Sequence, residues 1–182
     1  MKKIRFIYKV LRLLNSQLVN ALQRVSCINL IPVLTSNTPN IIYNCDANSD
    51  TYSYFRMFDS DKAGTSYFSY KSLTTVASSP YVGYTFDVPS YISKVIIYDK
   101  SDDPAKRFDY AVEGLNESNQ WIQIGTYTSV KQSSGEVQKH EITCSLSNKF
   151  SAIRTRCTGA NTTYVHQAGY YGITIHEFEV YG

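Results

Sequence analysis

The chain has 182 residues, of which 43% are hydrophobic and 18% are charged, and its formal net charge is +3 at pH 7. This length suffices for one domain of ordinary size with a short appendage. No stretch approaches the roughly 20 consecutive apolar residues that a membrane-spanning helix needs. We therefore expect a single hydrophobic core and no membrane span.

The first predicted element is an amphipathic helix that ends before Pro32. Apolar side chains recur there in alternating steps of three and four residues, which places them on one seam of a coiled-coil type helix. We assign residues 1–32 to an N-terminal anchor and oligomerisation segment. The seam is wider than a two-stranded coil needs, so a homotrimer is favoured over a dimer. The seam residues are Ile4, Ile7, Leu11, Leu14, Leu18, Ala21, Val25 and Ile28.

The same segment is strongly basic, because no carboxylate precedes Asp46 whereas Lys and Arg occur repeatedly. A basic helix suits an acidic protein surface, an anionic membrane surface or nucleic acid. The apolar stripe needs a dry partner, so we favour a protein surface and expect no nucleic-acid partner. A signal peptide is disfavoured because Lys9 and Arg12 interrupt its apolar region. A lipoprotein modified at Cys27 is disfavoured by the same interruption and by Arg24.

The cysteines are too few and too scattered to form a disulfide framework or a metal site. We expect free buried thiols and assembly in a reducing cytoplasm. The four residues are Cys27, Cys45, Cys144 and Cys157.

After Pro32 the sequence consists of short runs rich in Tyr, Val, Ile and Thr, separated by turn-forming residues. This pattern predicts strands, and no helical pattern separates the runs, which excludes βαβ units. The expected fold is mainly β, a sandwich of seven or eight short strands. The predicted strands include residues 82–86, 95–98, 108–114, 121–127, 137–144, 152–157 and 172–181.

The last predicted strand changes parity along its length. Ile173 and Ile175 share one face, whereas Phe178 and Val180 fall on the opposite one. We therefore predict a β-bulge near His176 that re-aims Glu177, a carboxylate among apolar neighbours that needs a partner.

Seven segments in order resemble the discoidin, or coagulation-factor C-type, domain, a galactose-binding-like jelly roll. The resemblance covers roughly residues 33–182 and implies a discoidin-like jelly-roll β-sandwich as the second domain. Two departures concern ligand preference more than fold, since Ser60 replaces a Gly and Tyr67 replaces a Trp of the family pattern. The matching segments are 57–59 (MFD), 65–67 (TSY), 81–86 (YVGYTF), 92–95 (ISKV), 108–110 (FDY), 121–124 (WIQI) and 175–182 (IHEFEVYG).

Residues 59–65 form an oxygen-rich loop of the kind that Ca²⁺ prefers. An ordinary acidic turn is the alternative, and Lys62 argues for it. The resemblance places a structural Ca²⁺ of the family at this loop. It implies one Ca²⁺ held by Asp59, Asp61, Thr65 and the distal Glu177.

The chain contains 16 Tyr and a single Trp, and several tyrosines fall in predicted loops. A tyrosine offers an apolar face and a hydroxyl, which suits stacking on a sugar. The resemblance implies that glycans bind at loops on one end of the sandwich. The candidate ligand-binding residues are Tyr164, His166, Tyr170, Asn161 and Arg156.

Catalysis is not expected. The three histidines, His140, His166 and His176, lack metal-ligand spacing and form no nucleophile and base pair with other residues. Trp121 matches a core position of the family, and we interpret Arg154, which matches a late-strand arginine, as structural.

A short helical anchor on one jelly roll resembles the head fibre, tail fibre and decoration proteins of tailed bacteriophages. This resemblance implies a virion component that docks on capsid or other virion proteins through its basic helix and meets host surface glycans. Its location would be the virion, assembled in the bacterial host cytoplasm. The alternative is a bacterial surface-attached carbohydrate-binding module or lipoprotein.

Overall fold

The computed structural model describes residues 28–45, 53–62, 68–72, 80–99, 108–129, 136–145, 148–160 and 171–182. The helix predicted over residues 1–32 falls mainly outside this part of the chain, and so do all its seam residues except Ile28. Within the described residues, no helix combines the length and apolarity that crossing a bilayer requires.

The larger sheet has five antiparallel strands in the order β1-β3-β8-β5-β6. Residues rich in Val, Ile, Thr and aromatics form it, as expected for strands whose alternate side chains are buried. The strands are β1 (Ile41–Tyr43), β3 (Tyr81–Tyr91), β5 (Phe108–Asn116), β6 (Trp121–Ser129) and β8 (Lys149–Ala160).

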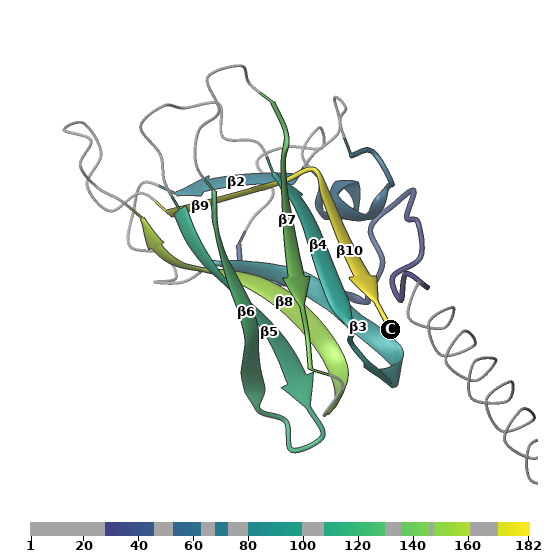
Figure 1. Ribbon diagram of the computed structural model, residues 1–182. Helices are drawn as coiled ribbons and strands as arrows, with labels where there is room; N and C mark the ends of the chain where they lie inside the picture. The colour runs from purple at the N-terminus through teal and green to yellow at the C-terminus, as the bar shows by residue number, and fades with distance from the viewer. Residues whose placement is uncertain are drawn as a thin grey trace, which may run out of the picture.

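A three-stranded antiparallel sheet, β10-β4-β7, lies across one face of the larger sheet (Figure 1). It consists of β4 (Lys94–Asp99), β7 (Gln138–Thr143) and β10 (Glu177–Tyr181). A further pair joins β2 (Phe68–Ser72) to β9 (Tyr171–Ile175), and a short 3₁₀ helix, η2 (Tyr54–Phe58), packs against β10. The mainly β sandwich predicted from the sequence is confirmed, whereas β1, β2 and η2 were not predicted.

The predicted bulge near His176 is instead a change of sheet. Residues 171–175 pair with β2, and residues 177–181 pair with β4, so His176 separates two strands that belong to different sheets. The sequence correctly indicates that the apolar side chains change face near His176. The cause is that the chain changes its partner strand there, from β2 to β4. The His176 amide donates to the Tyr98 carbonyl at 2.8 Å, which holds the crossing point against β4.

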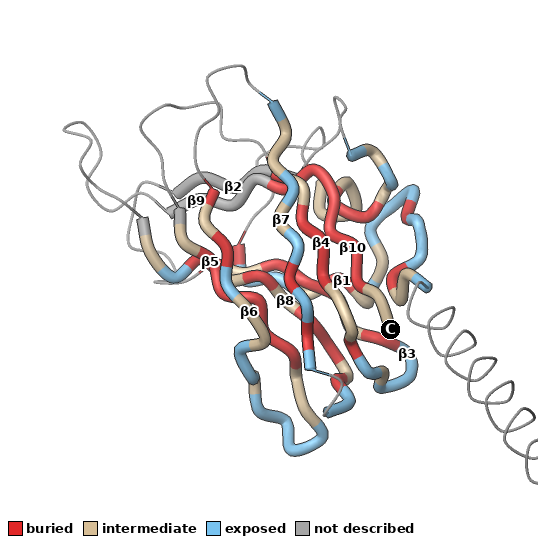
Figure 2. Tube along the Cα trace, in the orientation of Figure 1, coloured by how far each residue is buried: buried red, intermediate tan, exposed pale blue. Residues whose placement is uncertain are grey.

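The core fills the space between the two larger sheets (Figure 2). Its centre is aromatic, since Phe58 of η2 packs against Tyr84 of β3 and Phe178 of β10 with ring centroids 5.5 and 6.0 Å apart. Cys45, Cys144 and Cys157 are buried free thiols, as the sequence predicts, and Cys27 lies outside the described residues.

The segment after Ile28 runs antiparallel beside β10 and satisfies part of its free edge. The Leu30 amide donates to the Val180 carbonyl at 2.6 Å, and the Asn29 side-chain oxygen accepts from the amides of Val180 and Ile31. The side chain of Ile31 is fully buried in the core. Residues 29–31 are therefore attached to the sandwich by both hydrogen bonds and packing.

Candidate functional site

Three long connections leave the same end of the sandwich. Phe108 at the start of β5 lies opposite Ser129 and Ala160, the last residues of β6 and β8, and Asp99 at the end of β4 lies opposite Gln138. A contact between the rings of Tyr127 and His140, with centroids 4.7 Å apart, brings these ends of the two sheets together. We call this region the loop end, and it carries the connections 100–107, 130–137 and 161–170.

The predicted sugar-binding residues belong mostly to the last of these connections. Asn161, Tyr164, His166 and Tyr170 fall between β8 and β9 and lie outside the described residues. Arg156 belongs to the described residues. It lies on strand β8 and not in a loop, and it forms an ion pair with Glu113 of β5.

Arg156 belongs to an ion-pair cluster on the outer face of the five-stranded sheet. The Glu113 carboxylate accepts from Nε of Arg154 at 2.7 Å and from Nη2 of Arg156 at 2.6 Å. Burial raises the pKa of Glu113, but the hydrogen bonds from Arg156 and Arg154 and their charges outweigh it, so the pKa is lowered. One carboxylate thus balances two guanidinium groups, which leaves the cluster of Glu113, Arg154 and Arg156 with a net positive charge.

The Arg154 guanidinium also packs between two aromatic rings. Its central carbon lies 4.0 Å from the Trp121 ring centroid and 4.6 Å from that of Tyr81. The expectation that Arg154 is structural agrees with this packing. The expectation of a core position for Trp121 is wrong, because its half-buried ring lies on the outer face of the sheet, outside the hydrophobic core.

A polar cluster lies between the sheets directly beneath the loop end. His140 Nε2 is 2.9 Å from Asp99 Oδ1, and Asp99 is 1% exposed. The Tyr127 hydroxyl lies 3.2 Å from the Thr155 hydroxyl, and its ring stacks on Tyr110 at 4.6 Å. Hydrogen bonds and stacking therefore fix the strand ends from which the connections of the loop end depart.

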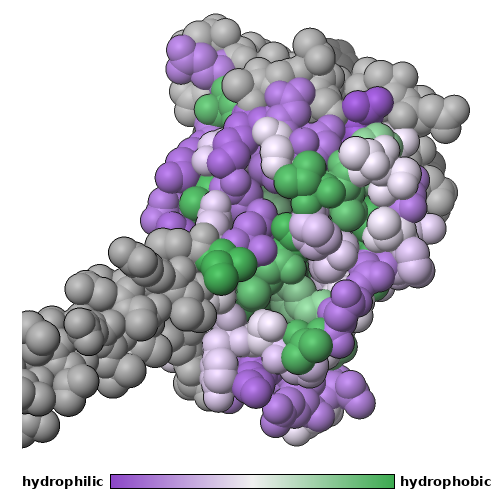
Figure 3. All heavy atoms as spheres, turned by 90° about the vertical axis from the view of Figure 1, so that its right-hand side faces the viewer, coloured by the Kyte–Doolittle hydropathy of each residue, from purple (hydrophilic) through white to green (hydrophobic). Residues whose placement is uncertain are grey.

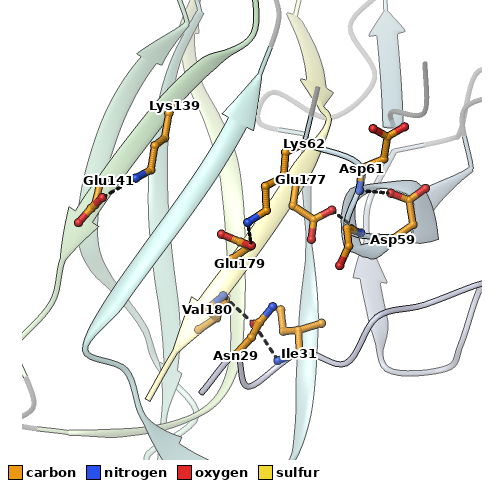
Figure 4. A network of polar contacts seen from close by, with 11 residues as sticks. Asn29, Ile31, Asp59, Asp61, Lys62, Lys139, Glu141, Glu177, Glu179 and Val180 are labelled. Atoms are coloured by element: carbon orange, nitrogen blue, oxygen red, sulfur yellow. Dashed lines mark hydrogen bonds and ion pairs between the residues drawn. The ribbon is translucent and has the colours of Figure 1, made fainter. Parts of the chain in front are cut away.

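The predicted calcium loop lies against the outer face of β10 (Figure 4). Glu177 Oε2 accepts from the Ser60 amide at 2.8 Å, and Asp59 Oδ1 accepts from the Asp61 amide at 3.1 Å. Ser60 has a positive φ of 68°, the conformation that a Gly adopts at no steric cost, and Gly is what the family pattern has there. The re-aimed Glu177 thus has the partner that the sequence predicted it would need.

Glu177 is a buried carboxyl, with 2% of its surface exposed. Its pKa is raised to about 8, mainly by burial and in addition by the charges of Asp59 and Glu179, whereas the hydrogen bond from the Ser60 amide and the charge of Lys62 oppose the shift. The ionised form of the Glu177 carboxyl is therefore disfavoured at this buried position unless a cation lies beside it.

Lys62 supplies one such cation, since its ammonium forms an ion pair with Glu179, two residues along β10 from Glu177. The pKa of Lys62 is raised mainly by this hydrogen bond to Glu179. In Figure 4 the Asp61 carboxylate points away from Glu177, and Thr65 lies outside the described residues. Among the described residues, no three His, Cys, Asp or Glu side chains gather as metal ligands, so a Ca²⁺ here needs loop carbonyls besides Glu177 and Asp59.

Sequence reasoning missed Glu113 and Asp99, the two buried carboxylates that organise the outer face and the loop end. A signal for both existed, because each is an acidic residue inside or at the end of an apolar strand run and therefore needs a partner. Arg154 and His140 lie 41 residues from their partners Glu113 and Asp99, and Arg156 lies 43 residues from Glu113, so these pairs follow only from which strands are neighbours.

No protein-family model and no curated protein sequence matches the chain. Solved structures do match it. Chitosan-binding module 1 of a chitosanase/glucanase from Paenibacillus sp. IK-5 is 18% identical with a TM-score of 0.55, and the match covers 85% of this chain and 99% of that module.

Two further binding modules have the same fold. The family 32 carbohydrate-binding module of NanJ from C. perfringens, solved with galactose, is 12% identical with a TM-score of 0.54 and coverage of 78% and 93%. The corresponding module of AlyQ, solved with 4,5-unsaturated mannuronic acid, is 10% identical with a TM-score of 0.53 and coverage of 81% and 98%. The described part of the chain thus has the β-sandwich fold of these binding modules.

Proposed function

We propose that this chain is a non-catalytic glycan-binding protein that displays one jelly roll on an N-terminal anchor. The observation that carries the proposal is the end-to-end match to whole sugar-binding modules, 99% of the chitosan-binding module and 93% of the galactose-bound module. A match that spans nearly the whole of each binding module favours a binding unit over a fragment of a catalytic domain.

The glycan-binding site that we propose is the loop end. The polar cluster beneath it, with Asp99, His140 and Tyr127, holds the strand ends rigidly and so suits it as a base for variable binding connections. The connection 161–170 provides aromatic and hydrogen-bonding groups next to each other in the sequence, which is the combination that sugars require.

The proposal predicts that Tyr164→Ala, His166→Ala and Tyr170→Ala each weaken sugar binding about tenfold, because a stacked ring or a directed hydrogen bond contributes roughly 1–1.5 kcal/mol. The measurement is calorimetric titration with bacterial surface oligosaccharides. Ile122→Ala is the control, since this 37% exposed side chain lies near the start of β6, at the opposite end of that strand from the loop end. Unchanged binding in all three variants would remove the loop end as the site.

The anchor is the second part of the proposal. We infer that residues 1–32 oligomerise the chain and dock it on a virion protein such as the capsid, with host glycan adhesion as the task of the displayed domain. The support is the apolar stripe joined to a basic, carboxylate-free outer face. Mass spectrometry of purified phage particles tests this role. A bacterial surface module remains the alternative, and a mature protein that begins at Cys27 would establish it.

We also propose one structural Ca²⁺ at Glu177 and the 59–65 loop, with Asp59, Asp61 and Thr65 as the other candidate ligands. The oxygen donors suit this ion. A buried carboxyl whose pKa is raised to about 8 is a group whose ionised form a bound cation would stabilise.

Glu177→Gln separates the effect of the carboxyl from that of the ion. In chelator, the free energy of unfolding of the wild type should fall as pH rises from about 4.5 to about 8, because the folded state binds the Glu177 proton more tightly than the unfolded state does. The Gln variant lacks this proton, so it should be the more stable protein at pH 8 without Ca²⁺.

Added Ca²⁺ should reverse that order. A ligand at 100 times its dissociation constant stabilises the folded state by about 2.7 kcal/mol, and only the wild type keeps the carboxylate. The measurement is the calorimetric melting temperature of each protein under four conditions, at pH 5 and at pH 8, each with chelator and with excess Ca²⁺. A wild-type melting temperature that does not change with Ca²⁺ at either pH would exclude the ion, and the pH dependence would then come from the burial of the Glu177 carboxyl.

A further inference from the structure

Exposed apolar side chains gather where the described chain begins. Ile28 is 59% exposed, and its carbonyl accepts from the Gly182 amide at 3.3 Å. A Cβ at Gly182 would lie 3.0 Å from Leu30 and 3.2 Å from the Tyr91 carbonyl, so these residues adjoin. Val88, three residues before Tyr91 on β3, is 70% exposed. We call the exposed Ile28, Val88 and Tyr91, together with Leu30, which is partly buried against the core, the junction patch.

Scattered exposed apolar residues need no explanation, but a contiguous group usually marks a contact surface. Figure 3 shows apolar side chains gathered on the face that carries the start of the described chain, with polar side chains around them. Tyr91 is 47% exposed, although a strand end next to a turn would tolerate a polar residue equally well. The junction patch therefore indicates a surface that another apolar surface covers.

Ile28 identifies the covering surface, because it belongs to two features at once. It is the last residue of the apolar stripe that begins at Ile4, in unbroken steps of three and four, and it is also the first residue of the junction patch. In a bundle of identical helices the stripe faces the neighbouring copies. Side chains that adjoin Ile28 on the jelly roll then face the same neighbours.

We propose that the junction patch is a contact surface for a second copy of this chain, which extends the seam of residues 4–28 onto the jelly roll. The proposal rests on the oligomeric anchor proposed above. It adds that the displayed domains contact one another at the base, through Ile28, Val88 and Tyr91, and are not held by the stem alone.

The test changes residues of the jelly roll and leaves the stripe intact. In the full chain, Val88→Glu with Tyr91→Glu should weaken self-association at least tenfold in sedimentation equilibrium, because charged side chains then replace apolar ones in the contact between copies. Lys149, whose ammonium lies 5.4 Å from the Tyr91 ring centroid, can offset only one of the two new carboxylates. Both side chains are exposed, so the fold should survive, and circular dichroism of the variant checks this. Val88→Ser with Tyr91→Ser repeats the test without added charge and should weaken association in the same direction.

Ile122→Glu is the matched control, because Ile122 is 37% exposed on β6, the edge strand at the far side of the five-stranded sheet. It should leave association within twofold of the wild type. A double variant that associates like the wild type, while Leu11→Asp with Leu18→Asp dissociates the protein, would overturn the junction patch and retain the anchor. A wild type that is monomeric at high concentration would overturn both.

Discussion

Replacing Leu11 and Leu18 together by Asp is expected to convert the protein into monomers and to abolish its firm attachment to glycan-coated surfaces. The two residues occupy one position of the predicted seam, a heptad apart. Unpaired carboxylates buried there would cost several kcal/mol per bundle at a rough estimate. Linked binding sites gain about 10²–10⁴ in apparent affinity over a single site, and the monomer would lose this gain.

Two measurements distinguish avidity from damage to the site. Retention on an immobilised glycan surface should fall by the avidity factor, whereas calorimetric titration with a soluble monovalent sugar should give the wild-type affinity. Ser16→Asp with Asn20→Asp is the matched control, since it adds the same charge at positions off the apolar stripe. Equal retention of the seam variant and the wild type would show that each chain binds alone.

Gly83→Ala is expected to destabilise the jelly roll by about 3 kcal/mol or more, the upper range for overpacked interiors. A Cβ at this position would collide with the Ile153 carbonyl oxygen and would lie 2.6 Å from the Arg154 Cα. Both atoms are backbone of the central strand β8, so no side-chain rotation relieves the contact. The substitution would push β3 away from β8 and misplace the Arg154 guanidinium between its two rings.

Gly159→Ala is the control for this prediction, because Gly159 lies on the same strand β8 but pairs with Asp109 of β5. The nearest atom to a Cβ there is 3.6 Å away, in the Asp109 side chain, which is an ordinary contact. We expect a change below about 0.5 kcal/mol. Urea unfolding of the two variants and the wild type measures both effects, and equal midpoints for Gly83→Ala and Gly159→Ala would contradict the close approach of β3 and β8.

The strands that the sequence predicts correctly are runs whose apolar residues alternate, such as 108–114 within β5, or follow one another without interruption, such as 95–98 within β4. Strand β1 has three residues, and β2 has the sequence FSYKS, so neither presents enough alternation to be recognised. Without β2, the parity change before Phe178 has no second sheet to explain it, and a bulge is the natural interpretation.

The residues of the candidate site also differ in whether a local sequence pattern predicts them. Glu177 and its need for a partner follow from local pattern, because a carboxylate among apolar neighbours is costly when unpaired. Glu113 and Trp121 depend on topology instead. The register between β5 and β6 shifts between Val112 and Glu113, and the neighbouring strand β8 supplies Arg154 and Arg156. Which strands are neighbours is a long-range property that one sequence does not encode in any short window.

The position of the segment 28–31 has a mechanical consequence. The chain enters beside Gly182 and runs antiparallel to β10, to which it is joined by the Leu30 amide and the Asn29 side chain. If the anchor is fixed and the loop end holds a glycan, tension acts along β10 and loads these hydrogen bonds in shear, so that they share the force. A pull across the strands would break them one at a time. The same contacts that close the edge of the sheet would thus make the domain resist detachment under flow.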